Sequence, residues 1–291
     1  MFNQNMIIKT DQPIVKNPEQ ITQQIADFWD QISVAWRTVW GEHIHHGYYE
    51  NGIEHSPKRA QEILIEKLSD LLQIHEGNKI LDAGCGMGGS SLYLNEKYHA
   101  HVTGITLSSK QAMIASQEAQ KRHCKDISFK VEDALSMASL QDNYFDIVWS
   151  LESCEQMFDK AMFIKQAFRV LKPGGKFLLA TWCSDKNEYE GKLAKKYKKL
   201  CLAFDLPYMP TIDRYHELLA MYHFNVIAKL DWSPFVKKSW DIGISLVNAY
   251  SFITILRMAG WRGLRFKYQT KLMQEAFHQD RVRYGVFVAT K

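Results

Sequence analysis

From residue 79 onward, short apolar runs alternate with segments of helical or loop character. The runs of β-strand length are 79–83, 101–107, 127–133, 145–150, 176–182, 224–232 and 284–290. Strands separated by helical segments are typical of a mostly parallel sheet with helices on both faces. The pattern therefore predicts a doubly wound α/β fold with a mostly parallel, seven-stranded sheet.

Residues 20–75 have a helical, aromatic-rich pattern instead, and Ser56-Pro57 is a good start for its second helix, with apolar residues at helical spacing after it. The last two strands are separated by about fifty residues rich in Trp, Tyr, Phe and Arg. So long a connection usually has structure of its own. We predict a helical cap and cofactor flap at 1–75, a core at 76–185, and a lid, acceptor-pocket helices and two strands at 186–291.

The composition is that of an ordinary globular protein. Of 291 residues, 46% are hydrophobic and 23% charged, and the net charge of +4 is too small to indicate nucleic-acid binding. Five scattered cysteines without a C-x-x-C pair argue against a disulfide scaffold or a cysteine zinc site. We find no signal-peptide pattern and no apolar run long enough to span a bilayer, so we expect a cytoplasmic enzyme.

The segment 80–91, "ILDAGCGMGGSS", contains the candidate ligand site. Gly84, Gly86 and Gly89 match G-x-G-x-x-G, the pattern of a dinucleotide-binding turn. Such a turn lets a ligand approach the backbone, and the helix that follows offers unpaired N–H groups. The pattern alone leaves open whether the ligand is NAD or another molecule.

Three neighbouring features favour S-adenosylmethionine (SAM) over NAD. Asp82 would repel a pyrophosphate but attract the ammonium of an amino acid. After the next strand, where NAD sites have an acidic residue, this chain has Thr106 and Gln111. The third feature is "RVLKPGGKFLLATW" at 169–182, with a helix end, a Pro-Gly-Gly turn and a buried strand. A dehydrogenase remains an alternative, which tight NADH binding without SAM binding would support.

Several motifs together resemble the class I SAM-dependent methyltransferases, over 76–182. They are Asp82-x-Gly84-x-Gly86-x-Gly88, Glu132-Asp133 before Ala134, "FDIVWS" and "LKPGG". The stretches "WGEHIHHGYY", "GITLSSKQ", "VWSLESCEQM", "ATWC", "DWS" and "LRMAGWRG" resemble the γ-tocopherol methyltransferase group, with similarity to the cyclopropane-fatty-acid synthases. The resemblance implies a Rossmann-like fold and methylation of a lipophilic acceptor, often at carbon.

The resemblance also implies a cofactor site. Asp82 would position the methionine end of SAM, beside the backbone of Gly84, Cys85 and Gly86. The residues implied to bind the remainder are Thr106 and Gln111 at the ribose, Asp133 and Ala134 at the adenine, and Ser150 and Leu151 beside the sulfonium.

Methyl transfer needs proximity, alignment and, for a weak nucleophile, a base. Glu152 and Glu155 follow the fourth strand, at the sheet edge where α/β folds place their chemistry. The alternative is that both only order the loop or contact SAM. The resemblance aligns Glu155 with an acidic residue that helps hold bicarbonate in cyclopropane synthases, whereas Gln156 stands where the tocopherol group usually has His.

The segment "EHIHHGYY" at 42–49 contains His43, His45 and His46. A metal site is one interpretation, but the sequence shows no further ligand and the resemblance implies no required metal. We favour a flap over the cofactor, with His46 available for proton transfer. Tyr48 and Tyr49 would then pack on substrate or SAM.

Aromatic residues of the C-terminal third are candidates for the acceptor pocket, the alternative being the core of an added helical subdomain: Trp182, Trp232, Phe235, Trp240, Tyr250, Phe252 and Trp261. "KLAKKYKKL" at 192–200 is basic and amphipathic, as a solvated helix or a helix on an anionic membrane would be. The arginines of the tail could bind a diphosphate: Arg257, Arg262, Arg265, Arg281 and Arg283.

We therefore predict a SAM-dependent methyltransferase for a small lipophilic acceptor, with carbon as the target atom. A prenylated phenol and a prenyl diphosphate are the two acceptors considered. The alternatives are a small-molecule N-methyltransferase, favoured by an acidic pocket, and a non-catalytic SAM-binding regulator, which would lack an acceptor cavity. The sequence does not specify the oligomeric state.

Overall fold

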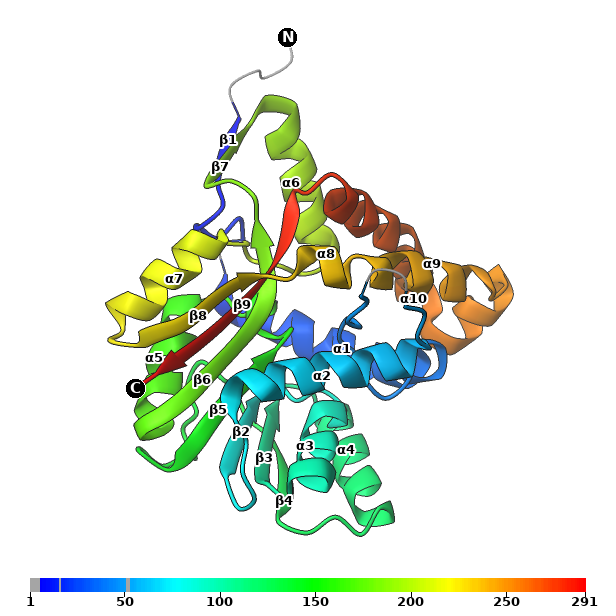
Figure 1. The fold of residues 1–291 in the computed structure, drawn as a ribbon. Helices are drawn as coiled ribbons and strands as arrows, with labels where there is room; N and C mark the ends of the chain where they lie inside the picture. Colours follow the sequence, from blue (N-terminus) through cyan, green and yellow to red (C-terminus); the bar gives the residue numbers. More distant parts are fainter. Residues whose placement is uncertain (1–5, 16, 51–52) are drawn as a thin grey trace.

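The computed structural model describes residues 6–15, 17–50 and 53–291. Seven strands form one sheet in the order β4-β3-β2-β5-β6-β9-β8 (Figure 1). They are β2 (Lys79–Ala83), β3 (His101–Thr106), β4 (Ile127–Val131), β5 (Phe145–Leu151), β6 (Leu171–Ser184), β8 (Asn225–Asp231) and β9 (Val282–Thr290). All neighbours are parallel except β9, which is antiparallel to β6 and to β8. The predicted fold class is confirmed.

Alternate residues of the central strands enter two different cores, because successive side chains of a strand point to opposite faces. Ile80 of β2 and Trp149 of β5 pack in one core, with α2 (Pro57–Leu72), α6 (Gly191–Ala203) and α10 (Phe252–His278). Leu81 and Val148 pack in the other, with α5 (Lys160–Val170) and α7 (Ile212–Met221). Two-sided burial explains why these strands are continuous apolar runs.

The carboxyl ends of β2, β3, β4 and β5 meet at one edge of the sheet. The chain passes from β2 through α3 (Gly89–Tyr98) to β3, and through α4 (Ser109–Lys121) to β4. It then returns to β5 on the other side of β2. This reversal of direction is the point where ligands bind in open α/β sheets.

The N-terminal part differs from the sequence prediction. Helix α1 (Pro18–Trp40), capped by the Asn17 side chain, ends at Gly41, whose φ is +105°. Residues 41–50 are not helical, so the helical pattern expected through this stretch is wrong there. A short sheet that the sequence did not indicate joins β1 (Ile7–Lys9) to β7 (Glu188–Glu190).

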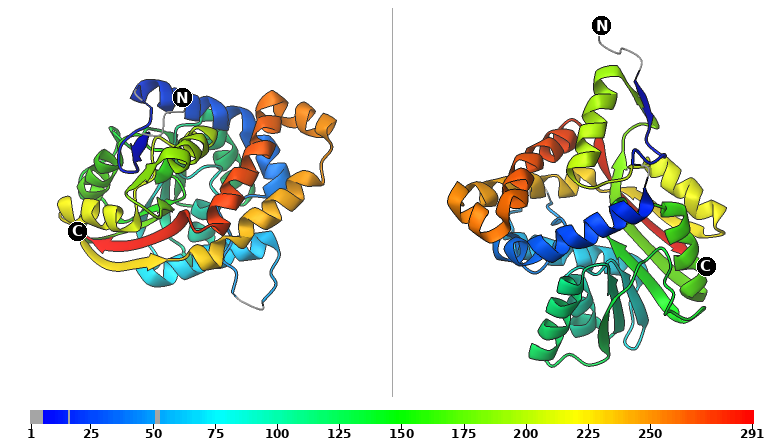
Figure 2. Two further views of the ribbon diagram at one scale, coloured as in Figure 1. Left: turned by 90° about the horizontal axis from the view of Figure 1, so that it is seen from above. Right: turned by 180° about the vertical axis from the view of Figure 1, so that it is seen from behind.

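The long connection before β9 is helical, as its length suggested. It forms α8 (Ser233–Val236), α9 (Lys238–Asn248) and α10, which is broken at Gly260. Figure 2 shows that the turn between α9 and α10, in orange, lies at the periphery of the molecule, away from the sheet. Within the described ranges no single helix is long and apolar enough to cross a membrane. One pair, Ser233–Asn248 with Phe252–His278, bent by 116°, meets that test of length and composition together.

Candidate active site

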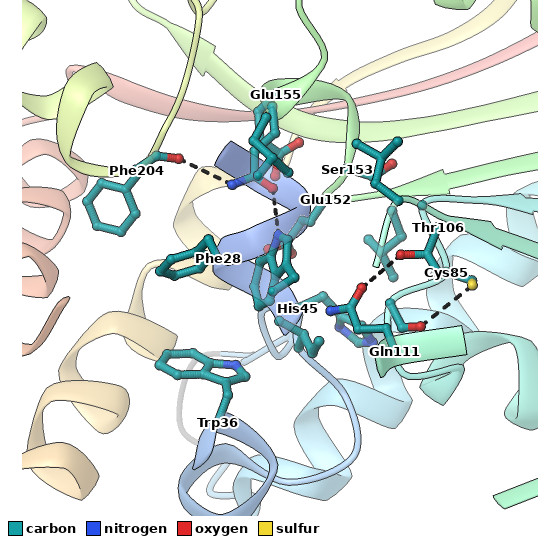
Figure 3. Close-up of a pocket in the computed structure, with 18 of the residues that line it drawn as sticks. Phe28, Trp36, His45, Cys85, Thr106, Gln111, Glu152, Ser153, Glu155 and Phe204 are labelled. Carbon is teal, nitrogen blue, oxygen red and sulfur yellow. Dashed lines mark hydrogen bonds between the residues drawn. The ribbon is translucent and has the colours of Figure 1, made fainter. Parts of the chain in front are cut away.

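A single pocket extends from the glycine turn after β2 to an aromatic chamber under α1, α9 and α10 (Figure 3). The first half is formed by loops at the carboxyl ends of β2, β3, β4 and β5. The predicted cofactor residues that line it are Asp82, Gly84, Cys85, Gly86, Thr106, Gln111, Asp133, Ala134 and Leu151. Sequence reasoning therefore placed most of this half of the pocket.

Ser150 is the exception among the predicted cofactor residues. Its side chain is fully buried and does not line the pocket. The Ser150 and Ser153 hydroxyls are hydrogen-bonded at 2.9 Å, and Ser153 Oγ donates to the backbone oxygen of Ala83. Because strand side chains alternate, Ser150 lies on the opposite face of β5 from Leu151, and Leu151 and Ser153 are the neighbours that line the pocket.

The glycine turn is shaped by backbone that L side chains rarely adopt. The φ angles of Gly84, Gly86 and Gly88 are +88°, +54° and +82°. A Cβ on Gly84 would lie 2.3 Å from the Cβ of Ser153, so the turn and the loop after β5 are in close contact. This contact fixes one wall of the pocket relative to the other.

Asp82 is a buried carboxylate with one side-chain partner among the described residues. Only 2% of it is exposed, and Ser91 Oγ donates to its Oδ2 at 2.5 Å. Burial raises the pKa of Asp82 to about 7, and the Ser91 hydrogen bond opposes this only in part. A cationic group placed beside Asp82 would stabilise its ionised form.

The far side of this half-pocket offers neutral and acidic hydrogen-bonding groups. Thr106 Oγ1 donates to Gln111 Oε1 at 2.8 Å, and Figure 3 shows the pair beside Cys85. Asp133 Oδ1 accepts from the backbone N–H of Leu135 at 2.8 Å, which fixes that carboxylate at the pocket wall. Polar groups thus follow the wall from β2 past β3 to β4.

The flap expected at 42–49 lies over the glycine turn. A Cβ on Gly89 would lie 2.8 Å from the backbone oxygen of Glu42, and one on Gly86 would lie 3.3 Å from Ile44. Gln61 of α2 donates to the backbone oxygens of His43 and His45. The flap is therefore fixed at its base by α2 and lines the pocket with residues 42–46.

His46 and Glu152 form a buried pair that sequence reasoning did not join. His46 Nδ1 lies 2.7 Å from Glu152 Oε2, and the His46 backbone N–H donates to Oε1 at 2.9 Å. Tyr284 of β9 also donates to Oε1, at 2.9 Å. Burial opposes the ionisation of Glu152, but the charge and hydrogen bonds of His46 outweigh it, so the pKa of Glu152 lies below its usual value.

The second ring nitrogen of His46 is left for a ligand. Nε2 is buried without a hydrogen-bond partner in the described part of the chain, and the ring packs edge-on against Trp182 and Trp240. Nδ1 is bonded to the Glu152 carboxylate, so Nε2 is the ring nitrogen that remains without a partner at the wall of the chamber.

The other two histidines have different surroundings. Burial lowers the pKa of His43 to about 2 and also lowers the pKa of His45, whose Nδ1 donates to the His46 backbone oxygen. Among the residues described, no group of three His, Cys, Asp or Glu side chains could hold a metal ion. The three histidines belong to the flap, and of them His46 alone is paired with a carboxylate.

Glu155 also lines the pocket, one turn beyond Glu152. Burial raises its pKa to about 8, and the charge of Glu152 adds to the shift. Thr181 Oγ1 donates to Glu155 Oε2 at 2.9 Å, and the buried Lys160 Nζ donates to the Glu155 backbone oxygen at 3.2 Å. Burial and the neighbouring charge of Glu152 therefore favour the protonated form of Glu155.

Gln156 connects the loop after β5 to two other walls of the pocket. Trp29 Nε1 of α1 donates to Gln156 Oε1 at 3.0 Å, and Gln156 Nε2 donates to the Phe204 backbone oxygen at 3.2 Å. An amide can accept from one wall and donate to the other, which explains how Gln serves at this position.

The aromatic chamber contains only part of the predicted acceptor set. Trp182 and Trp240 line it, each with an unpartnered indole N–H among the described residues. Lining residues that sequence reasoning missed come from α1, the turn after α6, and α10: Phe28, Trp29, Trp36, Phe204, Asp205 and Phe266. The seven-residue spacing of Trp29 and Trp36 on one helix was the available signal.

The other predicted acceptor residues lie elsewhere, and those predictions are wrong. Tyr48 stacks on Phe235 and packs against Trp232, and neither Tyr48 nor Trp232 lines the pocket. Tyr49 is buried beside this cluster, with its backbone N–H bonded to Phe235. Trp261 is 74% exposed on the outside of α10. Phe235, Tyr250 and Phe252 also lie outside the pocket lining.

The arginines considered for a diphosphate do not face the pocket either. None of Arg257, Arg262, Arg265, Arg281 and Arg283 lines it, and Arg283 pairs with Asp231 and Asp280. Indeed, in the described part of the chain no lysine or arginine lines the pocket, whereas several carboxylates do. Their position does not support the alternative in which these arginines bind a diphosphate in the pocket.

Comparison with known proteins agrees with this geometry. The model of a methyltransferase domain matches residues 74–229. The chloroplastic tocopherol O-methyltransferase of Arabidopsis thaliana is 33% identical, over 94% of this chain and 83% of that protein. The chain belongs to the SAM-dependent methyltransferases, close to the tocopherol group, and is an enzyme with SAM as its cofactor.

Two solved structures show the same fold. The cyclopropane synthase MmaA2 from Mycobacterium tuberculosis has a TM-score of 0.81 at 19% identity, covering 93% of this chain and 98% of that one. Geranyl diphosphate C-methyltransferase from Streptomyces coelicolor A3(2), in complex with Mg2+, geranyl diphosphate and S-adenosyl-L-homocysteine, has a TM-score of 0.72 at 21% identity, covering 96% and 99%. At these identities the likeness concerns the fold alone.

The close approach of Gly84 to Ser153 predicts a specific effect of substitution. Gly84→Ala should lower the free energy of unfolding by about 1–2 kcal/mol for the left-handed backbone, plus about 1–3 kcal/mol for the overlap. It should also weaken SAM binding at least about tenfold, because the wall must shift. Chemical denaturation and calorimetry measure the two effects.

Gly77→Ala is the matched control, because Gly77 has a φ of +78° with nothing within 4 Å of an added Cβ. Gly77→Ala should lower the free energy of unfolding only by the cost of the left-handed backbone, and it should bind SAM as the wild type does. Equal effects of both substitutions would contradict the account of the contact.

The raised pKa of Asp82 predicts how the stability of the cofactor-free protein depends on pH. An acid with a pKa raised to about 7 on folding keeps its proton in the folded state where the unfolded state has lost it. The contribution of Asp82 to stability is therefore greatest below pH about 4 and decreases up to about 7. Asp82→Asn should flatten the plot of melting temperature against pH in this range. An unchanged slope would show that burial does not raise the pKa of Asp82.

Proposed function

We propose that this methyltransferase acts on a lipophilic phenol, with the His46–Glu152 pair as the base that deprotonates the hydroxyl. The observation that carries the proposal is the unpartnered Nε2 of His46, buried between Trp182 and Trp240, while Nδ1 is bonded to Glu152. The aromatic walls of the chamber suit an extended apolar molecule. The relative from Arabidopsis is named for tocopherol, which supports the same class of acceptor.

The residues around the glycine turn fit SAM. Asp82 is a buried carboxylate short of a cationic partner, which the ammonium of the methionine end would provide. We infer that Thr106 and Gln111 bind the ribose and that Asp133 and Ala134 hold the adenine. When bound, SAM supplies a methyl group on a cationic sulfur that is a good leaving group. Alignment alone can contribute about 7–11 kcal/mol to such a transfer.

The chain's own part in the reaction is the handling of protons. His46 Nε2 accepts the phenolic proton, and Glu152 stabilises the imidazolium that results. The phenolate is electron-rich at oxygen and at the ortho and para carbons of the ring. We favour ring carbon as the target atom, as the sequence resemblance implied. Methylation at carbon gives a cyclohexadienone and releases S-adenosylhomocysteine. The ring carbon then loses its proton to solvent and the oxygen regains the proton held by His46, which restores the phenol, so one proton is released in all.

Substitution of the pair tests this role. Glu152→Gln and His46→Phe should each lower kcat about 10²- to 10⁴-fold with a prenylated phenol, since they remove the base or its partner. The SAM dissociation constant should change little. Tyr284→Phe is the control, because it removes a different hydrogen bond to Glu152 and keeps the His46 contact. A wild-type kcat in Glu152→Gln would contradict the assignment.

A lipophilic amine is the second candidate acceptor, because the chamber is acidic. Asp205 and Glu155 line it, and no lysine or arginine does so within the described residues. Burial raises the pKa of Asp205, and the charges of Arg265 and Arg262 oppose that shift in part. An ammonium in an aromatic chamber would be attracted both by the carboxylate and by the ring faces.

Asp205→Asn distinguishes the two candidates. If amines are the substrates, the KM for an amine should rise about tenfold or more, because a buried charge pair is lost. If phenols are the substrates, kcat/KM for a prenylated phenol should change less than about threefold. The release of S-adenosylhomocysteine with each acceptor class measures both constants, and amine turnover without phenol turnover would overturn the phenol proposal.

A further inference from the structure

The outer face of α10 and the neighbouring face of α6 form a surface that the catalytic site does not explain. Trp261, Arg265, Tyr268 and Leu272 recur at intervals of four, three and four residues after the break at Gly260, so they share one stripe of the helix. Arg265, Tyr268, Gln269 and Leu272 of α10 line a groove with Met6 and with five residues of α6: Lys195, Lys198, Lys199, Leu202 and Ala203. We call this surface the basic-aromatic face.

Large apolar side chains are unusually exposed here. Trp261 and Tyr268 are each 74% exposed, and Leu202 is 43% exposed. At the start of α10, Phe252 is 58% exposed, and its ring lies 6.4 Å from that of Trp261. Contiguous exposed apolar surface of this kind marks an interaction site.

The positive charge of the groove indicates an anionic partner. Its described lining includes three lysines and Arg265, and no aspartate or glutamate. Exposed tryptophan and tyrosine beside lysine and arginine are the composition of a protein surface that lies in the headgroup region of a bilayer.

The same helix separates this face from the catalytic chamber. Phe266 and Thr270 of α10 line the chamber, whereas Arg265 and Tyr268 line the outer groove. Ala203, near the end of α6, lines both. A molecule dissolved in a bilayer beneath the outer face would therefore be one helix away from the aromatic chamber.

We propose that the basic-aromatic face docks the enzyme on an anionic lipid surface. Lys198, Lys199 and Arg265 attract the phosphate headgroups, and Phe252, Trp261 and Tyr268 enter the interface. This inference does not depend on which acceptor the enzyme methylates. It goes beyond the methyl-transfer chemistry by assigning a partner to the exterior of α6 and α10.

The test is sedimentation of the purified full-length protein with vesicles. Wild-type protein should bind vesicles that contain phosphatidylglycerol more tightly than vesicles of phosphatidylcholine alone, and salt should weaken that binding. Each basic residue near an anionic surface contributes about fivefold in affinity. The double variant Lys198→Gln with Arg265→Gln should therefore bind the phosphatidylglycerol vesicles roughly 25-fold more weakly than the wild type. Trp261→Ser should lose about tenfold, because the indole no longer enters the interface.

Two variants on other surfaces are matched controls. Lys165→Gln removes an exposed charge from α5, and Met221→Ser removes an apolar side chain, 58% exposed, at the end of α7. Both should bind vesicles as the wild type does. All variants should bind SAM normally, which confirms that they are folded and separates this test from any result on turnover.

Three results would overturn the proposal. They are wild-type protein that does not bind either vesicle, face variants that bind like the wild type, and control variants that lose as much as the face variants. Analytical ultracentrifugation addresses a second copy of the chain as the partner. If Trp261→Ser turns a dimer into a monomer without changing vesicle affinity, the face is a dimer interface instead.

Discussion

The Glu152 carboxylate holds together three segments that are far apart in the sequence. It accepts hydrogen bonds from the backbone and ring of His46 in the flap and from Tyr284 of β9, and it follows directly on β5. Its φ of +51° shows that the loop adopts a rarely used conformation to place it there. The flap, the last strand and the chamber wall are therefore positioned around one ionised group.

Burial affects the carboxylates of the pocket differently, depending on whether each has a partner that compensates its charge. Asp82 and Glu155 have raised pKa values because little in the protein compensates their charge, whereas the pKa of Glu152 is lowered by its histidine. A cationic group beside Asp82 would stabilise its ionised form, whereas Glu152 has its partner, His46, within the protein.

Local motifs made the sheet and the cofactor half predictable from the sequence. The turn after β2 and the residues after β3 and β4 are set by short segments, so Asp82 and Thr106 could be placed from local sequence and Asp133 from the resemblance to the methyltransferases. The prediction that Ser150 lines the cofactor site failed, because a shift of one residue along a strand moves a side chain to the other face of the sheet. The His46–Glu152 contact spans 106 positions, and no local pattern encodes it. The prediction that Trp261 lines the acceptor pocket failed, because aromatic composition does not reveal which side of a helix faces the chamber.

The most direct test of the central claim is a crystal structure with S-adenosylhomocysteine and a prenylated phenol bound together. The account predicts that the phenolic oxygen lies about 2.6–3.2 Å from His46 Nε2, with the prenyl chain against the aromatic walls. A hydroxyl directed away from His46, with Nε2 in contact only with the acceptor's apolar part, would contradict the assignment of the base.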